Sequence, residues 1–168
     1  DPYLYTSLKE CYVAKGDSAA ALQTLQEGLK VFPQDVVVLT ELINYYLVKG
    51  EGEKALSYLQ KAKEQDPGNK SYYFAEGTLY DKMGKVDDAV NAYKKALSID
   101  STYFDAYFNL GVLYFNNAVK LTEVANNEPD NKKYAEKKKV ADDEFLKVAP
   151  YMEKAYKMAE LIDFEGKT

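Results

Sequence analysis

The sequence predicts an all-α protein of about four helical hairpins, the last of which is extended by an inserted helical arm. Three observations predict this fold class. Residue types recur with a period of 34, and apolar residues recur at helical spacing within each period. The chain of 168 residues is also 46% apolar and 29% charged, with only 9 Gly and 5 Pro to interrupt helices. A fixed period of this length indicates stacked hairpins that bury their apolar faces against one another.

The first helix of each hairpin is predicted from a stripe of large apolar residues. In the first period Tyr5, Leu8 and Tyr12 stand at i, i+3 and i+7, which is the spacing of one helix face. Each first helix then ends near a glycine, because glycine readily adopts the left-handed conformation that closes a helix. The recurring columns are Tyr5, Leu39, Tyr73 and Tyr107, then Tyr12, Tyr46, Tyr80 and Tyr114, and finally Gly16, Gly50 and Gly84.

The second helix of each hairpin follows a polar turn in which a residue such as Asp17 can cap its first turn. Small residues recur within this helix, which indicates that two helices cross closely there. A proline, Pro33 or Pro67, closes the first two periods because it cannot continue a helix. The columns of the second helix are Ala21, Ala55 and Ala89, then Leu25, Leu59 and Tyr93, and then Gly28, Ala62 and Ala96.

The fourth period contains an insertion. Its expected small residue is Glu123, whereas Val148, Met152 and Ala155 restore the spacing of a second helix later in the chain. Two apolar stripes flank the polar turn 126–131, so we predict an antiparallel helical arm, with a break near Pro150. The predicted organisation is units one to three and the first helix of unit four in 1–118, the arm in 119–147, and the second helix of unit four with a tail in 148–168.

These columns resemble the tetratricopeptide repeat (TPR), whose signature is an aromatic residue, a Leu-Gly pair, Tyr, and then small, aromatic and small residues before a Pro. The likeness is strongest in residues 70–101 and weaker in the first two units, where Lys9 and Ile43 replace a glycine. It implies an α-α superhelix whose inner groove, lined by the first helices, holds a peptide segment of a partner protein. We expect a bacterial member of the family with a long insertion in its last repeat.

The resemblance also implies which residues face that groove. They are Tyr3, Thr6, Glu10, Val37, Thr40, Asn44, Phe74, Thr78, Asp81, Asp105, Phe108, Asn109, Val112 and Phe115. We expect Phe74, Phe108 and Phe115 to anchor the ligand, because exposed aromatic residues mark interaction sites. The basic clamp with which some family members hold a carboxyl terminus is absent, and the three acids of the set disfavour acidic ligands.

The composition argues against several functional classes. The chain has no His, no Arg and one Cys, so zinc sites and Ser-His or Cys-His catalytic pairs are disfavoured. We therefore predict no enzyme and no cofactor. A net charge of −5 argues against a nucleic-acid partner, and no apolar run is long enough to insert into a membrane.

Two functions remain open from the sequence. The first is a protein-interaction scaffold that binds a peptide segment of a partner in the groove. The alternative is a structural or self-assembling spacer, whose groove is filled by a second copy or by its own C-terminal helix near Leu161 to Phe164. Bacterial cytoplasm and periplasm fit equally well. Since the chain begins at Asp1 and not at Met, we expect it to be a piece of a longer protein.

Overall fold

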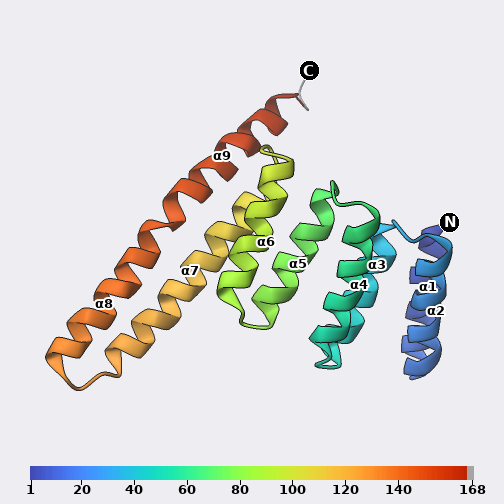
Figure 1. Cartoon of the computed structure of the whole chain (residues 1–168), viewed down its shortest axis with the longest axis horizontal. Coiled ribbons are helices and arrows are strands. Elements are labelled where there is room, and N and C mark those ends of the chain that lie inside the picture. Colours follow the sequence, from blue (N-terminus) through green and yellow to red (C-terminus); the bar gives the residue numbers. More distant parts are fainter. Residues whose placement is uncertain (166–168) are drawn as a thin grey trace. The chain divides into compact units, whose positions relative to one another are not determined.

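The protein is helical throughout the part that the computed structural model describes, which is the backbone of residues 1–165 and the side chains of residues 1–160. All regular elements in that part are α-helices, so the all-α prediction is confirmed. The chain divides into two compact units, Asp1–Lys85 and Val86–Thr168 (Figure 1). No helix within the described residues is both long enough and apolar enough to cross a bilayer.

The first unit contains two complete hairpins and the first helix of a third. Helices α1 (Pro2–Ala14) and α2 (Ser18–Val31) form the first hairpin, and α3 (Val36–Val48) and α4 (Gly52–Gln65) form the second. Helix α5 (Lys70–Lys82) follows. Helix α3 packs against each of the other four, so it forms the centre of this unit.

The first helices of this unit end in the same way, as the glycine column predicts. Gly16, Gly50 and Gly84 have φ values of 75°, 72° and 72°. After Gly16, the amide of Asp17 donates to the carbonyl of Tyr12 at 2.9 Å, and the two equivalent bonds are 2.8 and 2.9 Å long. This is the Schellman closure, which needs a left-handed residue and therefore favours glycine. The sequence thus sets the direction of the chain after each first helix.

The core of the first unit lies around α3. Leu25, Leu39, Leu42 and Leu59 are fully buried there, in columns that the repeat predicts. Helix α1 behaves differently, because it buries no residue completely. Leu8 is 45% exposed, although the same column holds the buried Leu42. Leu8 thus lies on the apolar stripe of its helix and is still exposed, since no second helix of an earlier hairpin lies against α1 among the described residues.

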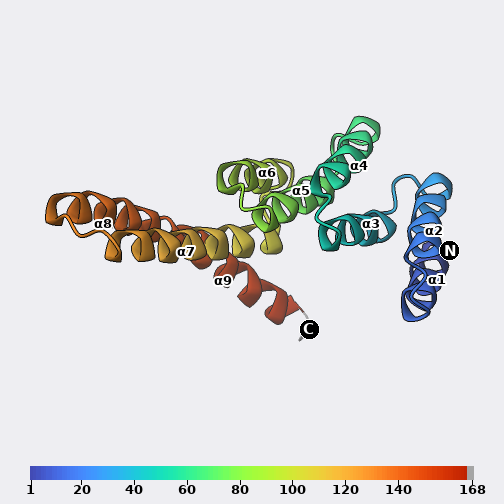
Figure 2. The same ribbon diagram turned by 90° about the horizontal axis from the view of Figure 1, so that it is seen from below.

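The second unit is organised around one long helix. Helix α7 (Phe104–Asn126) packs against α6 (Val86–Ile99), α8 (Asn131–Leu146) and α9 (Val148–Glu165). Figures 1 and 2 both show α7 and α8 side by side, joined by a short turn at one end. The α8–α9 break lies at Lys147, which places Pro150 in the first turn of α9, where its missing N–H costs no helical hydrogen bond. The predicted break is confirmed.

The inserted residues contribute to the buried interior of this unit. Ala125 and Ala141 are fully buried, and the carboxylate of Glu144 is nearly so. That carboxylate accepts hydrogen bonds from Nδ2 of Asn117 at 2.9 Å and from Nζ of Lys147 at 2.5 Å. Helix α7 runs without a break across residues 118 and 119, so the boundary of the arm stays a prediction.

Candidate functional site

The expected groove residues of the first unit lie on α1, α3 and α5, and none of them is buried. Tyr3, Glu10 and Val37 are exposed, and Thr6, Thr40, Asn44, Phe74, Thr78 and Asp81 are half-buried. Helix α3 packs against both α1 and α5, so the three helices that carry these residues are neighbours. We call this set the first-helix face of unit 1.

The polar residues of this face differ in whether their side chains already form a hydrogen bond within the protein. The hydroxyl groups of Thr6 and Thr78 donate to carbonyl groups of their own helices, those of Tyr3 and Phe74, at 3.0 and 3.1 Å. The half-buried amide of Asn44, in contrast, has no hydrogen-bond partner within the described part of the chain. It remains available to hydrogen-bond a ligand's backbone, because an amide both donates and accepts.

The expected groove residues of the second unit lie on one stripe of α7. Phe108 is 45% exposed and Phe115 is 49% exposed, with the half-buried Val112 between them. The ring of Phe104 stacks on Phe108 at 6.0 Å between centroids, and Phe145 of α8 meets Phe115 edge-on at 5.8 Å. We call Phe104, Phe108, Phe115 and Phe145 the aromatic row. Asp105 is exposed and Asn109 is half-buried on the same helix.

The sequence did not identify two members of this row. Phe104 stands one helical turn before Phe108, so its position could have indicated the contact. Phe145 belongs to a different helix, and only the packing of α8 on α7 brings it to Phe115.

The neighbouring stripe of α7 is covered by α9. The ring of Tyr151 lies 6.3 Å from that of Tyr107 and 5.5 Å from that of Tyr114. Between them, Met152 packs so closely on Gly111 that a Cβ there would lie 2.8 Å from its Cε. Within the described side chains, α9 therefore covers this stripe and leaves Phe108 and Phe115 exposed. The expected tail contact of Leu161 to Phe164 lies outside the described side chains.

The buried stripe gives a prediction for alkaline pH. Burial, with smaller contributions from Tyr151 and Glu144, raises the pKa of Tyr114 from 10.0 to about 12. The stabilisation from the neutral phenol is therefore fully present below pH 10 and is lost as the pH rises through about 12. In a tyrosinate absorbance titration, we expect Tyr114→Phe to remove a component at the alkaline end. Loss of a component that titrates near pH 10 instead would contradict the assigned burial.

The charges of the expected groove residues all have one sign. The set contains Glu10, Asp81 and Asp105 and no lysine. Lysines close to the first-helix face are already paired: Lys9 lies 2.8 Å from Glu41, and Lys63 lies 2.5 Å from Glu76. These surfaces therefore favour uncharged or basic ligands.

Two family models match the chain. A model described as tetratricopeptide repeat matches residues 8–75, and a second, described as TPR repeat, matches residues 77–117. Together they extend over most of the chain, in the part where the 34-residue columns are continuous.

Individual proteins show the same likeness. The chain is 34% identical over 111 residues to the probable UDP-N-acetylglucosamine--peptide N-acetylglucosaminyltransferase SPINDLY of Hordeum vulgare, a match that spans 62% of this chain and 12% of that protein. Among solved structures, MamA RS-1 (ArsTM double mutant) has a TM-score of 0.59 at 17% identity, covering 97% of this chain and 78% of that one. MamA MSR-1 has a TM-score of 0.57 at 19% identity, covering 95% and 78%. At these identities the structural likeness shows the fold alone. Three findings agree: the repeat columns, the glycine closures and the two family models. Together they show that this chain belongs to the tetratricopeptide repeat family.

Proposed function

We propose that this chain, a protein-interaction scaffold of the tetratricopeptide repeat family, binds a peptide segment of a partner protein on the exposed faces of its first helices. The aromatic row of α7 carries the proposal. Phe108 and Phe115 are each about half exposed, and each is held by a second ring at 6.0 or 5.8 Å. Rigid, partly exposed aromatic side chains lose little entropy on binding and are common anchors of protein interfaces.

The first-helix face of unit 1 supports the same function through polar and acidic side chains, where the aromatic row of α7 offers rings. Asn44 supplies an amide without a partner among the described residues, and the charged residues of the face, Glu10 and Asp81, are acids. We expect the ligand to be an uncharged or mildly basic segment that carries apolar side chains. The enzyme name of the barley relative does not transfer to this chain, because the match covers 12% of that protein.

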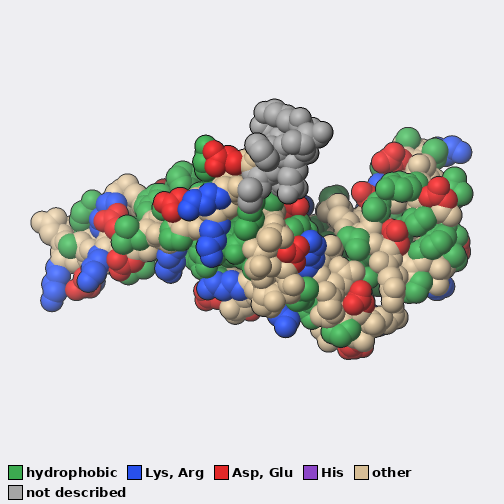
Figure 3. Space-filling view, turned by 90° about the horizontal axis from the view of Figure 1, so that it is seen from above, with side chains coloured by type: hydrophobic (Ala, Val, Ile, Leu, Met, Phe, Trp, Pro, Cys, Tyr) green, Lys and Arg blue, Asp and Glu red, His purple; other side chains and the backbone are tan. Residues whose placement is uncertain are grey.

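A self-assembling spacer is the second candidate, and the exposed surface of α1 favours it. Leu4 is 68% exposed and Leu8 is 45% exposed, whereas the same columns in α3 hold the buried Val38 and Leu42. Figure 3 shows apolar side chains gathered at the surface of the end of the chain where α1 and α2 lie. A second copy that covered Leu4 and Leu8 would bury this surface.

The test is a peptide-display selection on the wild type and on the Phe108→Ala/Phe115→Ala variant. We expect peptides that bind the wild type to lose about 2 kcal/mol or more of binding free energy on this variant, as interface anchors do. The matched control is Val124→Ala/Val140→Ala, which shortens two exposed apolar side chains elsewhere in the second unit. Circular dichroism checks that both variants remain helical.

Equal enrichment of the same peptides on the wild type and the phenylalanine variant would overturn the proposal. The molecular mass, measured at two protein concentrations, distinguishes the second candidate. A mass that rises with concentration in the wild type, and stays monomeric in a Leu8→Lys variant, would support the self-assembling spacer.

A further inference from the structure

The first unit contains a cavity of about 550 Å³ between α2 and α4, the second helices of its two hairpins. Its apolar lining consists of Leu29, Pro33, Tyr58 and Ala62, and none of the expected groove residues lines it. Its volume lies within the range of roughly 300–1,000 Å³ that is usual for sites of small ligands. The cavity is therefore a second candidate site, separate from the first-helix face.

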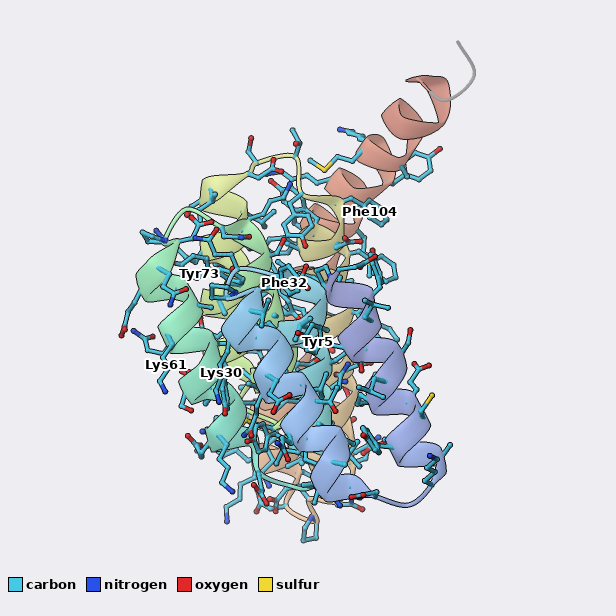
Figure 4. All side chains as sticks on the ribbon, turned by 90° about the vertical axis from the view of Figure 1, so that its right-hand side faces the viewer. Tyr5, Lys30, Phe32, Lys61, Tyr73 and Phe104 are labelled. Atoms are coloured by element: carbon cyan, nitrogen blue, oxygen red, sulfur yellow. The ribbon has the colours of Figure 1, made fainter. Side chains whose placement is uncertain are left out.

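Two cations line this cavity, Lys30 from the last turn of α2 and Lys61 from α4, and no acidic side chain does. Figure 4 shows both lysines on the same side of the unit. Neither forms an ion pair within the described residues. The nearest acids along each helix are engaged by amides, since Glu27 accepts from Gln23 at 3.0 Å and Glu64 accepts from Gln60 at 3.2 Å. The lining of the cavity therefore carries two positive charges and no negative one, although the chain has a net charge of −5.

The wall of the cavity is held in place by hydrogen bonds and ring contacts. The side-chain amide of Gln26 donates to the hydroxyl oxygen atoms of Tyr58 at 3.1 Å and Tyr46 at 3.3 Å. The rings of Tyr46 and Tyr58 are stacked with centroids 5.7 Å apart, and Nζ of Lys61 lies 5.8 Å from the Tyr58 centroid. Such contacts fix the Tyr58 ring before a ligand arrives, which lowers the entropic cost of binding.

We propose that this cavity, the lysine pocket, binds an amphipathic carboxylate. An apolar group of the size of a leucine or phenylalanine side chain packs on Tyr58 and Leu29, and its carboxylate lies between Lys30 and Lys61. A singly charged carboxylate is less costly to remove from water than a doubly charged phosphate, which suits a pocket with an apolar lining and two cations. A free organic acid and the C-terminal residue of a polypeptide both offer this chemistry. The pocket and the first-helix face thus select ligands of opposite charge.

The test is an NMR titration of the isotope-labelled whole chain with N-acetyl-L-phenylalanine and, separately, with its neutral amide. We expect the acid to shift the side-chain amide of Gln26 and the methyl group of Ala62 in a saturable way. The amide should bind about tenfold more weakly, because it forgoes a charge-assisted contact. Peptides that end in phenylalanine, with a free or an amidated C-terminus, form the second pair of probes. A free-acid peptide that binds more tightly than the acetylated amino acid identifies a polypeptide as the source, and the reverse order identifies a small acid.

The variant for this test is Lys30→Gln/Lys61→Gln, and we expect it to bind acid and amide equally. The matched control, Lys15→Gln/Lys82→Gln, removes the same charge from exposed positions of the same unit outside the cavity. It should keep the preference for the acid. Equal affinities of the wild type for acid and amide, no saturable shift at Gln26 and Ala62, or an equal loss in the control would each overturn the proposal. The Phe108→Ala/Phe115→Ala variant should still bind the acid, so this result is independent of the proposed peptide site.

Discussion

Replacing Tyr72 by alanine is expected to destabilise the first unit by about 3–5 kcal/mol, the usual cost of removing a large aromatic side chain from a core. Tyr72 of α5 is completely buried in the cluster that contains Leu39 and Leu42 of α3. Its hydroxyl donates to the backbone carbonyl of Gln34 at 3.0 Å, which ties α5 to the segment before α3. The substitution therefore leaves a cavity and also removes a tertiary hydrogen bond.

The comparison variants for Tyr72 separate these two contributions. Tyr72→Phe keeps the ring and should cost about 1 kcal/mol, the net value of one hydrogen bond. Tyr80→Ala should cost less than Tyr72→Ala, because the structure places Tyr80 half-buried although its repeat column predicts a core position. Denaturant unfolding followed by circular dichroism measures all three. Equal losses for Tyr72→Ala and Tyr80→Ala would contradict the described core.

Replacing Gly28 by alanine is expected to destabilise the first hairpin by about 1–3 kcal/mol, as overpacking does. A Cβ at this buried position would lie 2.8 Å from Cγ and 2.9 Å from Cβ of Tyr5. Since the Cβ of Tyr5 is attached directly to the backbone of α1, no rotation of the side chain relieves the contact. Helix α1 must move away from α2, and the edge-on contact of Tyr5 with Phe32 at 6.1 Å is disturbed with it.

Whether Gly28→Ala lowers or raises the free energy of unfolding shows how closely α1 and α2 cross. In a helix without a close neighbour, the same change stabilises by about 1 kcal/mol through helix propensity alone. Gly111→Ala is the matched control, because the three atoms nearest to its Cβ would all belong to the side chain of Met152, a flexible residue that can rotate away. We expect a smaller loss there than at Gly28 in denaturant unfolding. A Gly28→Ala protein more stable than the wild type would show that the two helices do not cross this closely.

The candidate sites depended on sequence and structure to different degrees. The repeat register placed Phe108 and Phe115 on a helix face, and the structure leaves both about half exposed. The 34-residue repeat did not predict the lysine pocket, because its equivalent positions hold residues of opposite charge: Lys30 aligns with Glu64, and Lys61 aligns with Glu27. Those columns change sign between repeats, so only the packing of the hairpins shows that the two lysines line one cavity.

The sequence by itself determined the features that depend on neighbours along the chain. Gly16 and Asp17 close one helix and cap the next through backbone and side-chain bonds within a few residues, so their residue types were sufficient. Only the tertiary structure decided which helix faces are covered. Leu8 and Leu42 share a column and differ in burial, and Glu144 is buried because Asn117 and Lys147 satisfy its carboxylate. Burial depends on which other helices pack against a position, and a periodic sequence repeats the residue types without repeating those neighbours.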